Sequence, residues 1–123
     1  MAAWSHMQKA SDLRDSNVRN PADEDLGTIE EVMLDVENGC VGYAVLSFGG
    51  VLGIGDKLFA VPWTALEYDS EGEEFILDVS KQELVNAPGF DRDRWPDMAD
   101  PDWMSTVHGF YKTEPYRESA PRR

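Results

Sequence analysis

The chain has 123 residues, of which 24 are acidic and 11 are basic, so its formal net charge is -13. This length suits one domain with attached tails, and it is enough to bury a core without disulfides or a metal. Such an acidic surface repels the phosphate backbone, and no apolar run approaches the ~20 residues of a membrane-spanning helix. We therefore expect protein partners, with neither direct nucleic-acid binding nor membrane insertion.

Cys40 is the only cysteine, so the sequence offers neither an intramolecular disulfide nor a cysteine zinc cluster. This fits a reducing compartment, and we expect a cytoplasmic protein. Residues 1–10 are predicted to be a flexible leader. The stretch Ser5-His6-Met7 is typical of residues left from cloning, and the leader lacks the apolar stretch of a secretory signal.

Residues 11–88 carry the pattern of a β-rich domain that starts with a short strand around Val18. Val32, Leu34 and Val36 then follow the two-residue period of a strand. Ile29 is out of phase with these residues, so we expect a β-bulge near Glu30.

The dipeptide Asn38-Gly39 is a strong hairpin signal, because both central positions of a type I′ turn need a positive φ. The return strand at 40–48 is apolar on both faces, which indicates a central strand. A glycine-rich loop at 49–56 leads to a strand at 57–63. That strand should end or lie at an edge at Pro62, which has no N–H to donate.

Two further extended pieces are expected at 66–68 and 75–79, on either side of a turn. Ser80 and Glu83 then form a capping box, which starts a short helix that Pro88-Gly89 ends. Short strands joined by tight turns predict a mainly β fold, a small β-barrel with one short helix. Its expected core includes Tyr43, Val45, Phe59, Val61 and Leu77.

Residues 89–123 read as an acidic, aromatic C-terminal arm with a disordered end. Asp100 is a candidate N-cap for a second helix, with Pro101 at its first position and Asp102 near the positive end of its dipole. The helix would carry one apolar stripe, which must be covered by the barrel or by another chain. The stripe consists of Trp103, Val107, Phe110 and Tyr111.

Four segments, taken in order, resemble the PRC-barrel domain. They are residues 26–32 (LGTIEEV), 35–39 (DVENG), 43–50 (YAVLSFGG) and 56–63 (DKLFAVPW). The family takes its name from the cytoplasmic part of the photosynthetic reaction-centre H subunit, and it includes the C-terminal domain of a ribosome maturation factor.

The resemblance spans residues 11–87 and implies a β-barrel with an adaptor role and no shared catalytic site. Cys40 departs from it, because Arg or Lys is expected after the hairpin glycine. Reaction-centre membership does not carry over, since the membrane helix of the H subunit is missing. The N-terminal domain of the ribosome factor is missing as well.

Three specific kinds of site were considered and rejected: a phosphate-binding loop, a catalytic histidine and a calcium loop. Gly50 and Gly55 begin a phosphate-loop pattern, but Asp56-Lys57 replaces the required Lys followed by Ser or Thr. His108 has no evident nucleophile or orienting partner. The tail acids lack the glycine bend and the closing Glu of a calcium loop; they are Asp91, Asp93, Asp97, Asp100 and Asp102. We expect no catalytic residue, no metal, no nucleotide and no other cofactor.

The sequence favours a non-catalytic protein–protein interaction module for adaptor or assembly work, which forms a homo-oligomer, a dimer or larger. Apolar residues on a flexible loop and aromatics outside a barrel are candidate docking groups. The alternatives are a ribosome-associated assembly factor that binds a basic ribosomal protein, and an acidic metal-dependent enzyme. The candidate interaction surface consists of Val51, Leu52, Ile54, Trp95, Trp103, Phe110 and Tyr111.

Overall fold

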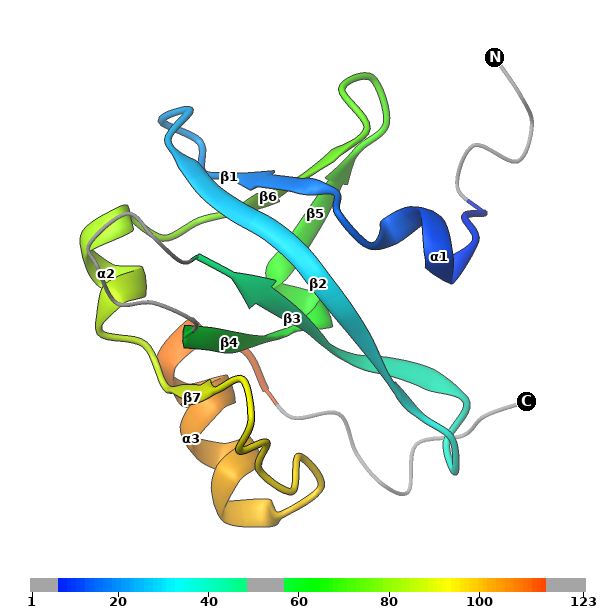
Figure 1. Ribbon diagram of the computed structural model, residues 1–123, viewed down its shortest axis with the longest axis vertical. Coiled ribbons are helices and arrows are strands. Elements are labelled where there is room, and N and C mark those ends of the chain that lie inside the picture. Colours follow the sequence, from blue (N-terminus) through cyan, green and yellow to red (C-terminus); the bar gives the residue numbers. More distant parts are fainter. Residues whose placement is uncertain (1–6, 49–56, 115–123) are drawn as a thin grey trace.

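The computed structural model describes residues 7–48 and 57–114 (Figure 1). One seven-stranded sheet has the order β5-β6-β1-β2-β3-β4-β7, so the mainly β fold is confirmed. Its strands are β1 (Asn17–Arg19), β2 (Asp25–Asp35), β3 (Cys40–Ser47), β4 (Lys57–Pro62), β5 (Leu66–Asp69), β6 (Glu74–Leu77) and β7 (Gly89–Asp91). The helices are α1 (Ala10–Leu13), α2 (Lys81–Val85), α3 (Pro101–Tyr111) and the 3-10 helix η1 (Trp63–Ala65).

The sheet curls around its core because the long strand β2 pairs with β1 near its start and with β3 along the rest of its length. The stretch that pairs with β3 runs from Thr28 to Asp35. Among the strands of the described residues, β1 and β6 run parallel, and the other pairs are antiparallel. β5 and β7 end the strand order and do not pair with each other in the described part of the chain, so the barrel stays open there.

The pairing of β2 shifts register at three points, one against β1 between Val18 and Arg19 and two against β3. The pairing register with β3 shifts between Ile29 and Glu31, which confirms the bulge predicted near Glu30. This shift lets Ile29 point into the core, where it is fully buried. A second shift, between Met33 and Leu34, was not predicted. It lies where the β2–β3 hairpin runs out beyond the other strands (Figure 1).

The turn of that hairpin is wider than predicted. It spans residues 36–39, and only Gly39 has a positive φ, of 70°. The side chain of Asp35 accepts hydrogen bonds from the backbone N–H groups of Glu37 and Asn38, at 3.1 and 3.0 Å. The two-residue type I′ prediction is therefore wrong, because the Asp35 carboxylate supplies acceptors that hold the longer turn.

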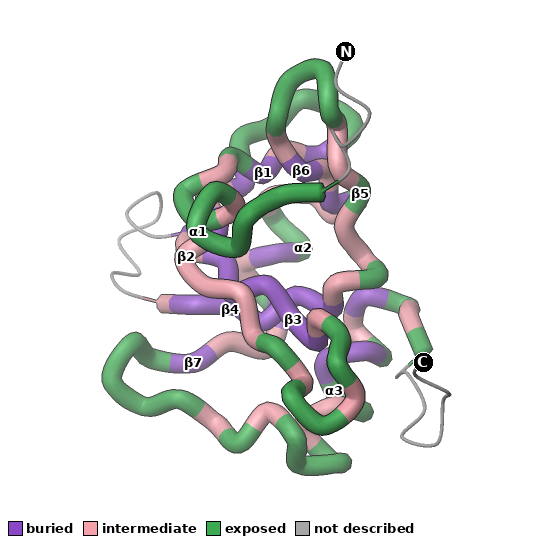
Figure 2. The backbone as a smooth tube through the Cα atoms, turned by 90° about the vertical axis from the view of Figure 1, so that its right-hand side faces the viewer, coloured by how far each residue is buried: buried purple, intermediate pink, exposed green. Residues whose placement is uncertain are grey.

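The core predictions are confirmed, since all five residues expected inside are buried. Gly27 lets β2 and β3 approach closely: its φ is 111°, and a Cβ there would lie 2.2 Å from the carbonyl oxygen of Ser47. Figure 2 shows the buried positions concentrated in the strands around this interior. The largest fully buried side chains are Phe59, Phe75, Leu26, Ile29, Leu46, Leu58, Leu77, Leu84, Val18, Val45, Val61 and Val107.

The C-terminal arm packs on its own barrel. Its first residues form β7, a strand that was not predicted, and Phe90 pairs with Leu58 of β4 and is buried. Val107 and Tyr111 of α3 join the core. The helix begins as predicted after Asp100, although the Asp100 side chain makes no capping hydrogen bond. Arg92 pairs with Glu30 at the bulge, which ties the arm to β2.

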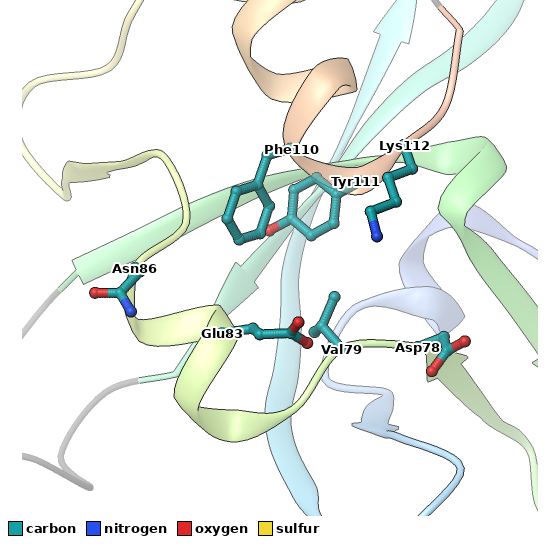
Figure 3. A pocket seen from close by; sticks show the side chains of 7 residues that line it. All are labelled: Asp78, Val79, Glu83, Asn86, Phe110, Tyr111 and Lys112. Atoms are coloured by element: carbon teal, nitrogen blue, oxygen red, sulfur yellow. The ribbon is translucent and has the colours of Figure 1, made fainter.

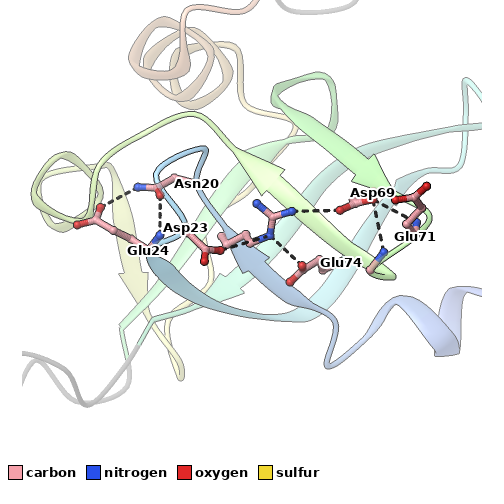
Figure 4. Close-up of polar contacts among 8 residues, drawn as sticks. Asn20, Asp23, Glu24, Asp69, Glu71 and Glu74 are labelled. Carbon is pink, nitrogen blue, oxygen red and sulfur yellow. Dashed lines mark hydrogen bonds and ion pairs between the residues drawn. The ribbon is translucent and has the colours of Figure 1, made fainter.

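A network of polar side chains links β1 and the β1–β2 turn to neighbouring segments (Figure 4). Arg19 of β1 pairs with Glu74 at 2.8 Å and with Asp69 at 3.1 Å, joining β1 to the β5–β6 hairpin. The buried Asn20 donates to Glu24 at 2.7 Å and to the Val79 carbonyl at 3.0 Å. The Asn20 hydrogen bond is the main cause that lowers the pKa of Glu24.

Candidate interaction surface

The structure separates the residues that the sequence grouped as docking candidates. Val51, Leu52 and Ile54 lie outside the described residues. Trp95 is 41% exposed, its ring lies 5.1 Å from that of Phe90, and its Nε1 donates to the Arg92 carbonyl at 2.6 Å. Trp103 is half-buried, with its ring 6.1 Å from that of Phe90.

Phe110 and Tyr111 meet in a hollow of about 290 Å³ between α2 and the end of α3 (Figure 3). Phe110 is half-buried and Tyr111 is buried. Two polar side chains of the wall already serve α2: Glu83 accepts from the Ser80 N–H, and Asn86 donates to the Gln82 carbonyl. The hollow is also lined by Asp78, Val79 and Lys112.

A larger groove, of about 590 Å³, lies between the outer end of the β2–β3 hairpin and the arm. We call it the hairpin groove. Its apolar lining comes from segments far apart in the sequence, which explains why sequence reasoning missed it. The lining consists of Met33, Leu34, Asp35, Val36, Glu37, Asn38, Gly42, Tyr43, Met98, Ala99 and Met104.

Two residues of the hairpin end expose most of their apolar surface. Leu34 is 59% exposed and Val36 is 86% exposed. The alternation predicted both in a strand, which holds for Leu34 in β2, whereas Val36 lies in the turn that follows. The hairpin has left the core by this point, so nothing buries either side chain. The same two side chains border a second hollow, of about 230 Å³, beside Gly39, Cys40 and Val41. Both sides of the hairpin end are thus open and apolar.

Tyr43 forms part of the groove floor and is held inside the protein. It is 4% exposed, it pairs across the sheet with Met33, and its ring lies 5.7 Å from that of His108 on α3. Its hydroxyl has no hydrogen-bond partner among the described residues, and burial raises its pKa to about 12. The methionines beside Tyr43 have flexible side chains.

The charge around the groove is negative. Among the described residues, the carboxylates that line it are Asp35 and Glu37, and no lysine or arginine does so. Asp97 precedes the groove residue Met98, and the exposed Asp100 and Asp102 lie at the start of α3. This rim favours cationic groups within a Debye length of about 10 Å.

Within 7–48 and 57–114, no group of three or more His, Cys, Asp or Glu side chains is placed to hold a metal ion. His108 is buried, its Nδ1 lies 2.9 Å from the hydroxyl oxygen of Thr113, and burial lowers its pKa. No helix in this part of the chain is long and apolar enough to cross a membrane.

Comparison with protein families identifies the barrel. The PRC-barrel domain matches residues 6–84, more than half of the chain. The chain belongs to the PRC-barrel family. PRC-barrel domains are typically protein-interaction or assembly modules and are generally non-catalytic. A search of curated proteins found no match.

The hairpin groove lies between the part of the chain that matches the family and the arm that follows it. The match ends in α2, before β7 and α3. Met33, Leu34 and Val36 thus belong to the PRC-barrel, whereas Met98 and Met104 belong to the arm that follows it. The groove exists because this chain adds an arm to the barrel.

Proposed function

We propose that this PRC-barrel protein is a non-catalytic interaction module that assembles with other proteins through the hairpin groove. The observation that carries the proposal is the exposure of Leu34 and Val36 on a projecting hairpin. Apolar surface costs about 25 cal/mol per Å² when it faces water, so a persistent patch of this kind is typical of a docking site.

The groove itself supports the proposal. It offers a volume of about 590 Å³ between the hairpin and the arm. Three methionines border it, and methionine side chains repack readily against partners of different shape. The family's typical role points in the same direction.

Affinity capture tests the proposal. Tagged wild-type protein, a Leu34→Ser/Val36→Ser double variant and a Met7→Ser control are incubated with extract from the native host. Met7 is a matched control, because it is an exposed apolar residue outside the groove. We expect a protein that wild type and Met7→Ser retain and the double variant loses. That protein, once purified, should bind wild type at least about tenfold more tightly than the double variant.

Two other outcomes would count against the proposal. Equal capture by the double variant would place the interface elsewhere on the molecule. No specific protein beyond a tag-only control would contradict the interaction role itself.

Finer statements about the partners belong to the same proposal. A basic ribosomal protein suits a chain of net charge -13, so a ribosome-associated assembly role is the alternative. A homo-oligomer is also proposed, supported by the exposure of Trp95 beside Phe90 and Trp103. The location proposed is the cytoplasm, supported by a single cysteine that is exposed and free.

A further inference from the structure

The hairpin groove has a floor formed by β-strands and a wall formed by a helix and the turn before it. The cross-strand pair Met33 and Tyr43 belongs to the floor, which is a face of the β2–β3 hairpin. Met98, Ala99 and Met104 form the wall, from the turn before α3 and from its first turns. A ligand in the groove would thus lie on a sheet face and beside a helix.

Helix α3 already covers the neighbouring part of the same region. His108 contacts the ring of Tyr43, and Val107 and Tyr111 enter the core. Beyond Tyr43 the hairpin continues without a cover, and Leu34 and Val36 stay exposed. A second helix alongside α3 would complete a layer of helices on the sheet, a stable way to bury an apolar sheet face.

From this geometry we propose that the hairpin groove binds a basic amphipathic helix of a partner protein, which deepens the proposed function and rests on it. The apolar side of that helix would contact the three methionines, Leu34 and Val36. Its lysines and arginines would face the acidic side chains that line the groove, Asp35 and Glu37. A methionine-bordered groove with an acidic rim suits such a helix in both apolar surface and charge.

A second copy of this chain fits the groove less well. Each copy carries a net charge of -13, so two acidic rims would repel each other. Among the described elements, α1 and α2 have only four and five residues, and the apolar side of α3 already packs on its own barrel. No described helix of a second copy can therefore supply a free apolar face with basic flanks.

Peptide binding to the full-length protein tests the helix. The probe is a leucine–lysine peptide of about 18 residues, long enough to form a helix, with its leucines on one face. A peptide of the same composition in shuffled order controls for general charge attraction, and a leucine–glutamate version controls for apolar contact alone. We expect the amphipathic lysine peptide to bind at least about tenfold more tightly than either control, and more weakly as salt rises.

The site at which the peptide binds is located by NMR, from the methyl resonances of the methionines. The signals of Met33, Met98 and Met104 should shift on binding, while that of Met7 should not. The Leu34→Ser/Val36→Ser variant should lose at least about tenfold in affinity, whereas Met7→Ser should bind like wild type. A circular dichroism spectrum of each variant checks that the fold is intact.

Several results would overturn the helix proposal. They are equal affinity for the shuffled peptide, equal affinity for the glutamate peptide, and unshifted methyls at the groove. Sedimentation adds a fourth, because self-association that the double variant abolishes would assign the groove to a second copy. If capture finds a groove-dependent partner but the peptides fail, this inference falls and the proposed function stands.

Discussion

Tyr43 buries a hydroxyl that has no hydrogen-bond partner among the described residues. Removing such a group costs no hydrogen bond, so Tyr43→Phe should change the free energy of unfolding by less than about 1 kcal/mol, in either direction. Tyr43→Ala removes the ring as well and should destabilise by about 3–5 kcal/mol. Urea unfolding of both variants checks this. A loss of several kcal/mol in Tyr43→Phe would mean that the hydroxyl has a partner.

His108 should make stability depend on pH. Burial lowers its pKa in the folded state, so between the folded and unfolded pKa values the unfolded chain binds more protons. Its contribution is therefore complete above the unfolded value of about 6.5, and it is lost as the pH falls from there toward the folded value. Melting temperatures between pH 7.5 and 5.5 should fall more steeply for wild type than for His108→Phe. Parallel curves would contradict this.

At the scale of elements, Asn20 holds the β1–β2 turn. It is buried, and its side chain bonds Glu24 (Figure 4) and also donates to the Val79 carbonyl ahead of α2. Asn20→Ala should destabilise by about 1–3 kcal/mol, because it removes the hydrogen bonds that the buried Asn20 side chain makes to Glu24 and to the Val79 carbonyl. Asn86→Ala removes one exposed hydrogen bond and should cost less than about 1 kcal/mol. Thermal melts that rank the two variants in the opposite order would refute this role.

Elements set by neighbouring residues were predictable from the sequence. The Ser80–Glu83 capping box is present with both of its hydrogen bonds, because its partners lie within one turn. The hairpin predicted at Asn38-Gly39 is present, but its type I′ turn was predicted wrongly because only the two turn residues were considered, whereas Asp35 also holds the turn. β7 was missed because it has only three residues, and its identity depends on β4, about thirty residues earlier in the chain.

The groove was beyond sequence reasoning for a related reason. Periodicity predicted a strand through Leu34 and Val36, but it did not show that the strand ends at Asp35 or that the hairpin leaves the core there. The sequence pattern around Met98 and Met104 does not indicate that they lie beside the hairpin. The packing of α3 brings them there. The aromatic stripe, in contrast, was predicted to need a cover, and Val107 and Tyr111 are buried.

At the scale of the whole molecule, two forces act on self-association. The arm covers its own barrel, so the aromatics of α3 do not require a second copy. Trp95 remains partly exposed beside Phe90 and is the arm's most exposed aromatic among the described residues. Against this apolar contact stands the repulsion between two chains of charge -13. Salt screens the repulsion and leaves the apolar contact intact.

We therefore predict a homo-oligomer whose formation increases with salt. Light scattering at about 100 μM protein should give a mass above the 13.8 kDa of one chain, with a larger average mass at about 0.5 M salt than at about 0.05 M. Trp95→Ser should return the mass toward the monomer, while Met7→Ser should not, because the contact proposed involves the arm. A mass of 13.8 kDa at both salt concentrations would refute the oligomer. A mass that falls as salt rises would show that opposite charges, and not apolar surface, hold the copies together.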